Sequence, residues 1–183
     1  MQGDPPFIKM LRTRRSIRRF QEKPIEPGLQ ALLKEAVLRS PSSRDLNPWE
    51  FIFIDDPETL ETLSRAKPHG AGFLKKAPLG ICIIADPEKC DVWIEDCSIA
   101  SIFLHLAAHS LGLGSCWIQI RKRTHNGSTS AESYIRGVLG VPENYHVLSI
   151  VAVGYPAEHP PGHPQSGLPC DKIFINRYGS TKK

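Results

Sequence analysis

The stretch Thr13-Arg14-Arg15-Ser16-Ile17-Arg18-Arg19-Phe20 places four arginines within six positions, with a serine among them. Two apolar residues, Ile17 and Phe20, interrupt the charge at a spacing of three. A fully solvated run of charge would not need them, so we interpret them as anchors to a core. Guanidinium groups bind phosphate through two parallel hydrogen bonds, and a serine hydroxyl adds one more donor. The stretch therefore indicates either a basic surface turn or an anchored segment that binds an anion.

Length and composition favour one globular domain that spans residues 1–183. The chain has 40% hydrophobic and 23% charged residues, which is ordinary for a soluble protein. The net charge of +4 permits an anionic ligand, but nucleic-acid binding usually needs a larger, clustered excess. No apolar run approaches the roughly 18 residues that span a bilayer, and the N-terminus lacks the features of a signal peptide. We therefore expect a cytoplasmic protein that binds neither nucleic acid nor membrane.

The cysteines and histidines give little sign of a metal site. The five cysteines are odd in number and none has CxxC spacing, which favours buried free thiols. His105 and His109 have the i, i+4 spacing of a helical metal pair, but no HExxH motif accompanies them. We therefore predict no metal site.

Apolar periodicity and turn signals predict alternating helices and strands. Helices are expected over about 5–13, 27–39, 57–66, 92–111 and 131–139, with a short helical piece over 73–76. Strands are expected over 49–55, 79–85, 115–120 and 147–155. The helix over 92–111 has few strongly polar groups, which predicts packing on most of its sides, and Gly112 is expected to end it. The alternation by itself predicts an α/β fold with a parallel sheet.

The tail over about 156–183 is rich in proline and predicted to be irregular. Its apolar residues Ile173, Phe174 and Ile175 are unusual for a disordered end. We therefore expect the tail to wrap another surface, such as a second subunit.

Three stretches share a pattern when they are considered together. They are Arg14-Arg15-Ser16-Ile17-Arg18, Ser40-Pro41-Ser42-Ser43 with Asn47-Pro48-Trp49, and Gly112-Leu113-Gly114-Ser115-Cys116-Trp117-Ile118-Gln119. An acidic pair, Glu95-Asp96, lies early in the long helix, and Val153-Gly154-Tyr155-Pro156 lies near the end. In this order and spacing, over nearly the whole chain, they closely resemble the FMN-dependent nitroreductase family.

The resemblance implies a fold that differs from the one predicted by alternation. It implies an α+β sandwich with a central, mainly antiparallel sheet of four or five strands, flanked by helices. It also implies an intertwined, domain-swapped homodimer with two FMN sites at the subunit interface, in which the final strand crosses to the partner. On this ground we expect the antiparallel sheet in place of the parallel one.

The resemblance also assigns roles to the basic stretch. Arg14 and Ser16 would hold the FMN phosphate, with Arg15 contributing through its guanidinium or its backbone. Arg18 would lie near the pyrimidine end of the isoalloxazine. A cation there would stabilise the negative charge that reduction leaves at N1 and O2.

Other residues would contact the flavin ring. Pro41, Ser42 and Ser43 would touch the flavin of the other subunit, and Asn47 could reach the same ring edge. The expected residues along one face of the ring are Trp117, Ile118 and Gln119, with a backbone N–H near N5. Each has a plainer alternative, because a strand tryptophan is often core and serines commonly cap turns.

The implied activity is a ping-pong transfer of hydride from NADH or NADPH, through flavin N5, to a small electron acceptor such as a nitroaromatic, quinone or flavin. No catalytic side chain is nominated, because the flavin carries the chemistry. One alternative is a flavoprotein of this fold that stores or fragments flavin. Another is a basic module that binds nucleic acid through Arg12 to Arg19.

Several positions depart from the family pattern or have two interpretations. Asp45 stands where relatives often have asparagine, and residues 164–169 lack the lysine or arginine that often completes the phosphate site. Lys172 or Arg177 could substitute, or the N-terminal arginines could act alone. Asp96 is expected to make a structural hydrogen bond to a neighbouring backbone group. The run Arg121-Lys122-Arg123 is expected to be a solvated loop, with contact to the 2′-phosphate of NADPH as the alternative.

Overall fold

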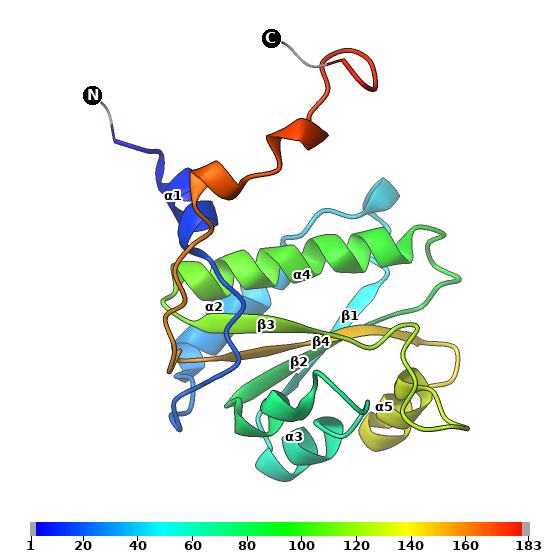
Figure 1. Ribbon diagram of the computed structural model, residues 1–183. Helices are drawn as coiled ribbons and strands as arrows, with labels where there is room; N and C mark the ends of the chain where they lie inside the picture. Colours follow the sequence, from blue (N-terminus) through cyan, green and yellow to red (C-terminus); the bar gives the residue numbers. More distant parts are fainter. Residues whose placement is uncertain (1–2, 181–183) are drawn as a thin grey trace.

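The computed structural model of the protein describes residues 3–180. Its centre is a four-stranded sheet in the order β1-β2-β4-β3 (Figure 1). The strands are β1 (Trp49–Ile54), β2 (Leu79–Ala85), β3 (Gly114–Gln119) and β4 (His146–Gly154). Every neighbouring pair is antiparallel. The parallel sheet predicted from alternation is therefore wrong, and the antiparallel sheet implied by the resemblance is confirmed.

The connection from β1 to β2 explains why alternation misled. A parallel crossover needs a helix that returns along the full strand length, about 20 Å for six residues. The helix in this connection, α3 (Pro57–Leu63), has only seven residues, or about 10 Å. The 3₁₀ turn over Gly72–Lys76 then brings the chain back to the same end of the sheet at which β1 finished, because Ile54 pairs with Gly80. The next strand therefore runs in the opposite direction.

Helices cover both faces of the sheet, as Figure 1 shows: α2 and α4 lie over one face, and α3 and α5 over the other. The remaining helices are α1 (Pro6–Thr13), α2 (Pro27–Leu38), α4 (Trp93–Ser110) and α5 (Ala131–Leu139). Proline occupies the first turn of α1, α2 and α3, where its missing N–H has no helical partner to lose. Gly112 follows α4 with a φ of 76°, as predicted for the residue that ends that helix.

Two apolar cores fill the space between the sheet and its helices. On the α2 and α4 side, Leu33, Ile81 and Leu104 are fully buried. On the α3 and α5 side, Leu63, Ile135 and Ile150 are fully buried. The sheet is therefore covered on both faces, and its two edge strands are β1 and β3.

The outer face of α4 corrects one prediction. Ile99, Ile102 and Phe103 are exposed by 37%, 44% and 37%. The helix is therefore not packed on most of its sides, because this stripe of apolar side chains faces away from the sheet. A contiguous exposed apolar face is typical of an interaction surface.

The tail leaves β4 and projects away from the body of the molecule (Figure 1). Over residues 163–180 every residue is exposed, and only two short 3₁₀ turns, Gln165–Gly167 and Cys170–Lys172, are regular. The described part of the tail contains no strand, although the resemblance implied one. Among residues 3–180, none of the helices has both the length and the apolar character needed to cross a membrane.

Candidate functional site

The basic segment, Thr13–Phe20, lies along the outer edge of β3. Ser16 forms a parallel bridge with Ser115, and the Ile17 N–H donates to the Ser115 carbonyl at 3.0 Å. Gly114 makes this close approach possible, because a Cβ at that position would lie 2.8 Å from the Ile17 side chain. The segment is therefore fixed against the sheet by its own chain.

The other end of the segment is fixed to the residues that follow β4. Phe20 bridges Pro156, and the Gln21 N–H donates to the Tyr155 carbonyl at 2.9 Å. Ile17 and Phe20 are buried, with 7% and 8% of their surface exposed. Their predicted role as anchors is confirmed.

Glu158 is a functional candidate that the sequence did not indicate. Its carboxylate accepts hydrogen bonds from the backbone N–H groups of Arg18, at 2.6 Å, and Arg19, at 3.2 Å. The Arg18 N–H is the first cause that holds the pKa of Glu158 below its usual value. The only sequence signal was its place two residues after the Val153–Pro156 motif, which does not reveal a contact with a segment 140 residues earlier.

The arginines of the basic segment differ in their partners. The Arg15 guanidinium donates to the Pro161 carbonyl. The Arg18 guanidinium lies 6.0 Å from the centre of the Phe73 ring. Arg14 is half-buried, and its side chain has no hydrogen bond or ion pair with any residue between 3 and 180. A half-buried cation without a partner is suited to bind an anion.

A cavity of about 340 Å³ opens beside Arg14. Its walls come from the start of the basic segment, the turn between α4 and β3, and the residues after β4. The lining includes Thr13, Arg14, Arg15, His109, Gly112, Leu113, Gly114, Ser115, Glu158 and His159. The cavity is therefore built where three distant parts of the chain meet.

The two histidines of α4 face this region without forming a metal pair. His105 Nδ1 lies 2.7 Å from the Ser115 hydroxyl, and His109 Nε2 lies 2.9 Å from the Thr13 hydroxyl. Burial, and secondarily Arg14, lowers the pKa of His105 to about 4, so this ring is neutral at pH 7. Within the described residues, no three His, Cys, Asp or Glu side chains are grouped in a way that could hold a metal ion.

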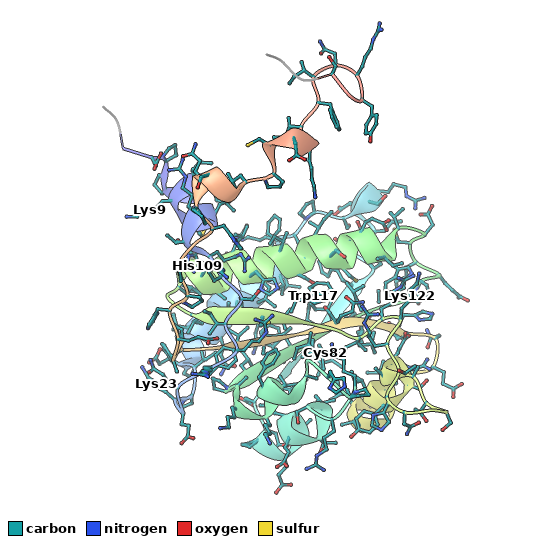
Figure 2. All side chains as sticks on the ribbon, viewed as in Figure 1. Lys9, Lys23, Cys82, His109, Trp117 and Lys122 are labelled. Atoms are coloured by element: carbon teal, nitrogen blue, oxygen red, sulfur yellow. The ribbon has the colours of Figure 1, made fainter. Side chains whose placement is uncertain are left out.

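The predicted residues on β3 lie next to the basic segment but differ in direction. Trp117 and Gln119 are half-buried on the α4 side. The Trp117 indole donates to Gln119 Oε1 at 2.9 Å, and Gln119 Nε2 donates to the Arg121 carbonyl at 2.8 Å. Ile118 is buried in the core on the opposite face, so only its backbone lies at the strand edge. Figure 2 shows His109 towards the α1 end of α4 and Trp117 further along the sheet.

The loop before β1, residues 41–47, contains the other predicted group, and its side chains bind one another. The Ser42 hydroxyl donates to Asn47 Oδ1 at 3.0 Å and accepts from the Asn47 N–H at 2.9 Å. The Ser43 N–H donates to Asp96 Oδ1 at 2.9 Å, which confirms the structural hydrogen bond predicted for Asp96. Pro41 is exposed at the start of the loop. The Ser42 hydroxyl therefore holds the shape of this loop in the single chain, whereas Ser43 contributes its backbone N–H; the predicted contact of both serines with a flavin stays a prediction.

The same loop holds three non-glycine residues in the left-handed region. Arg44, Asp45 and Asn47 have φ values of 53°, 55° and 46°. Aspartate and asparagine tolerate this conformation, but it is unfavourable for arginine. Asn47 Nδ2 donates to the Asp45 carbonyl, at 3.1 Å, and to its carboxylate, at 3.2 Å, and Arg44 pairs with Asp91. Strain of this kind is held only where the surroundings fix it, which is common at binding sites.

The two groups of predicted residues lie at opposite edges of the sheet. The basic segment lies beside β3, and the loop over 41–47 leads into β1. In the sheet, β2 and β4 separate β1 from β3. Three strand spacings place β1 and β3 about 14 Å apart. One chain therefore does not bring the two groups together.

Comparison with known proteins identifies the family. A profile of the nitroreductase family matches residues 11–67 and 64–155. A protein of Archaeoglobus fulgidus with the provisional name NADH dehydrogenase/NAD(P)H nitroreductase is 37% identical over 156 residues, which is 82% of this chain and 86% of the relative. A relative from Methanothermobacter thermautotrophicus with the same provisional name is 35% identical over 159 residues, covering 84% and 78% of the two chains.

Solved structures agree with this match. An FMN-dependent nitroreductase from Clostridium difficile is 45% identical and superimposes with a TM-score of 0.92, covering 93% of this chain and 99% of that one. A provisionally named NADH dehydrogenase/NAD(P)H nitroreductase from Parabacteroides distasonis is 30% identical, with a TM-score of 0.86 and coverage of 96% and 100%.

Proposed function

The chain belongs to the nitroreductase family, and on that premise we propose that it is an FMN-dependent oxidoreductase. It would take electrons from NADH or NADPH and pass them, in a ping-pong reaction, to a small acceptor such as a nitroaromatic, a quinone or a flavin. The observation that carries the proposal is Arg14, a half-buried cation without a partner in the described chain, beside a cavity at the edge of β3.

The residues at the cavity fit the phosphate of FMN. Arg14 and Arg15 supply two guanidinium groups on the cavity wall. Ser16, the next residue, is half-buried but does not line this cavity, so its contact with the phosphate stays a prediction. The acid nearby, Glu158, accepts from two backbone N–H groups and so already has partners. These hydrogen bonds leave the carboxylate charged, so the phosphate is held because the guanidinium groups of Arg14 and Arg15 outnumber this one acid on the cavity wall.

The edge of β3 fits a flat ring. Beyond the bridge at Ser115, the outer edge of β3 pairs with no other strand of the described chain, so its backbone groups are free to bind a ligand. When bound, FMN supplies the capacity to accept and donate hydride. Glu158 fixes the backbone of Arg18 beside this edge, and the Arg18 cation would stabilise negative charge on the reduced ring.

We also propose that the working unit is a homodimer with its sites at the interface. The loop over 41–47 lies at the sheet edge opposite the basic segment, so a second chain would bring its own loop to the site. The exposed apolar stripe on α4 and the apolar tail both offer surface for such a partner. The tail would wrap the partner. Each chain would form a single domain that spans residues 1–183.

The spectrum of the purified protein tests the proposal. We expect a flavin absorption that survives desalting and bleaches when NADH or NADPH is added without oxygen. Protein that retains no flavin and does not bind added FMN at micromolar concentration would overturn the proposal. A flavin that binds but does not bleach with either nucleotide would support the alternative of a flavoprotein without reductase activity.

A further inference from the structure

His109 lines the cavity beside Arg14, and its position is fixed by α1. It lies in the last turn of α4, half-buried, with its Nε2 2.9 Å from the Thr13 hydroxyl. His109 can therefore contribute to a phosphate site for which residues 164–169 offer no lysine or arginine. Lys172 and Arg177 lie on the exposed, projecting part of the chain and do not line this cavity.

The hydrogen bonds of Thr13 define the state of the His109 ring. The Thr13 hydroxyl lies 3.0 Å from the Lys9 carbonyl and 3.3 Å from the Met10 carbonyl, and it donates its single hydrogen to them. With its hydrogen directed to these carbonyls, the Thr13 oxygen is available to accept from His109, an arrangement that places the ring proton on Nε2. Nδ1 makes no hydrogen bond within residues 3–180 and is the atom that a second proton would occupy.

The charges around His109 come from three elements. They are Arg14 and Arg15 on the basic segment, Glu158 and His159 after β4, and His105 one turn earlier on α4. Burial, and then Arg14, lowers the pKa of His109 below its ordinary value, so the ring is neutral at pH 7 in the free protein. An anion beside Arg14 would offset the charge of that guanidinium and so raise the pKa of His109. The C-terminal end of helix α4 also favours a cation.

We propose that His109 is a phosphate-binding residue that takes up a proton when the FMN phosphate enters the cavity, in place of the missing tail cation. This inference rests on the proposed function. The new opposite charge favours the protonated ring, so binding and proton uptake are linked. Affinity for FMN is then greatest at low pH and falls as the pH rises and proton uptake becomes unfavourable.

The test measures the dissociation constant of FMN between pH 6.5 and 8, where a phosphate monoester is mostly a dianion. For the wild-type protein we expect affinity to fall by up to about tenfold over this range, because each unit of pKa shift corresponds to a factor of ten. Riboflavin, which lacks the phosphate, should bind without this dependence. Calorimetry of FMN binding in buffers of different ionisation enthalpy should reveal proton uptake.

Three variants separate this role from a structural one. His109→Gln can still donate to Thr13, and we expect it to bind FMN with neither the pH dependence nor the proton uptake. His109→Lys should bind FMN at pH 8 at least as tightly as the wild type, independently of pH. His163→Gln is the matched control, because His163 lines a different cavity with Ile8 and Leu11.

Several outcomes would overturn the inference. The inference is wrong if His109→Gln keeps the pH dependence and the proton uptake of the wild type. It is also wrong if both disappear in His159→Gln but persist in His109→Gln, because the proton would then belong to His159. A wild-type protein that binds FMN with no pH dependence would exclude the role of His109 while leaving the proposed function intact. Failure to bind FMN at any pH would instead refute the proposed function.

Discussion

The basic segment and the tail are both irregular stretches near a chain end, but they are held in opposite ways. Thr13–Phe20 is bridged to Ser115 and Pro156 and has two buried anchors. Residues 163–180 have no buried residue, and their apolar side chains are exposed. The charged stretch is therefore fixed by contacts within its own chain, whereas the apolar tail is suited to a surface that its own chain does not supply.

The largest expected effect comes from removing the tail. A chain that ends at His163 loses five exposed apolar side chains: Leu168, Ile173, Phe174, Ile175 and Tyr178. Burying each against a partner would contribute about 1.5–3 kcal/mol, so their loss should convert a dimer to monomer at micromolar concentration. Sedimentation across a range of concentrations measures this. A chain that ends at Tyr178 is the control, and a dimer that survives the longer deletion would contradict the role of the tail.

The next effect tests the anchor of the basic segment. Ile17→Ala should lower the free energy of unfolding by about 2–5 kcal/mol, because it leaves a cavity in a buried position. Denaturant unfolding monitored by circular dichroism measures the change. Arg19→Ala, on the exposed side of the same segment, should change it by less than about 0.5 kcal/mol. Similar losses in both variants would show that the segment is not anchored as described.

Acid should destabilise the protein through His105, which contacts Ser115, the residue that bridges the basic segment. The folded pKa of His105 is about 4, below its ordinary value of 6.5. The unfolded chain therefore binds more protons between these values, and the stability present above pH 6.5 is lost as the pH falls to 4. The shift corresponds to about 3 kcal/mol. Unfolding from pH 7 to 4 should show this extra loss in wild type and not in His105→Gln; an identical slope in both would refute it.

The smallest effects should separate two arginines of the same segment. Arg14→Ala should weaken FMN binding about 10- to 100-fold, the value of a charge-assisted hydrogen bond. Arg18→Ala should mainly lower the reduction potential of the bound flavin, because it removes a cation near the developing charge. Fluorescence titration and anaerobic redox titration measure the two effects. An equal loss of FMN affinity in both variants would refute the division of roles.

Much of the fold could be predicted from local patterns. The apolar runs of β2 and β4 and the proline and glycine signals of the helices locate these elements to within a few residues, because such patterns depend on near neighbours in the chain. The direction of a strand depends on whether the connection before it returns to the end of the sheet at which the previous strand finished or crosses to the other end. The alternation from β1 through α3 to β2 therefore predicted the wrong sheet, and only the family motifs corrected it.

For the candidate site, the chemical groups could be recognised from the sequence: a cluster of arginines with two apolar anchors, and a serine-rich loop before a strand. Their partners became known only from the folded chain. It placed Glu158 against the backbone of Arg18, His109 beside Arg14, and the serine loop at the far edge of the sheet. The first two pairs are 140 and 95 positions apart in the chain, and no local pattern encodes them, because they arise where packed elements meet.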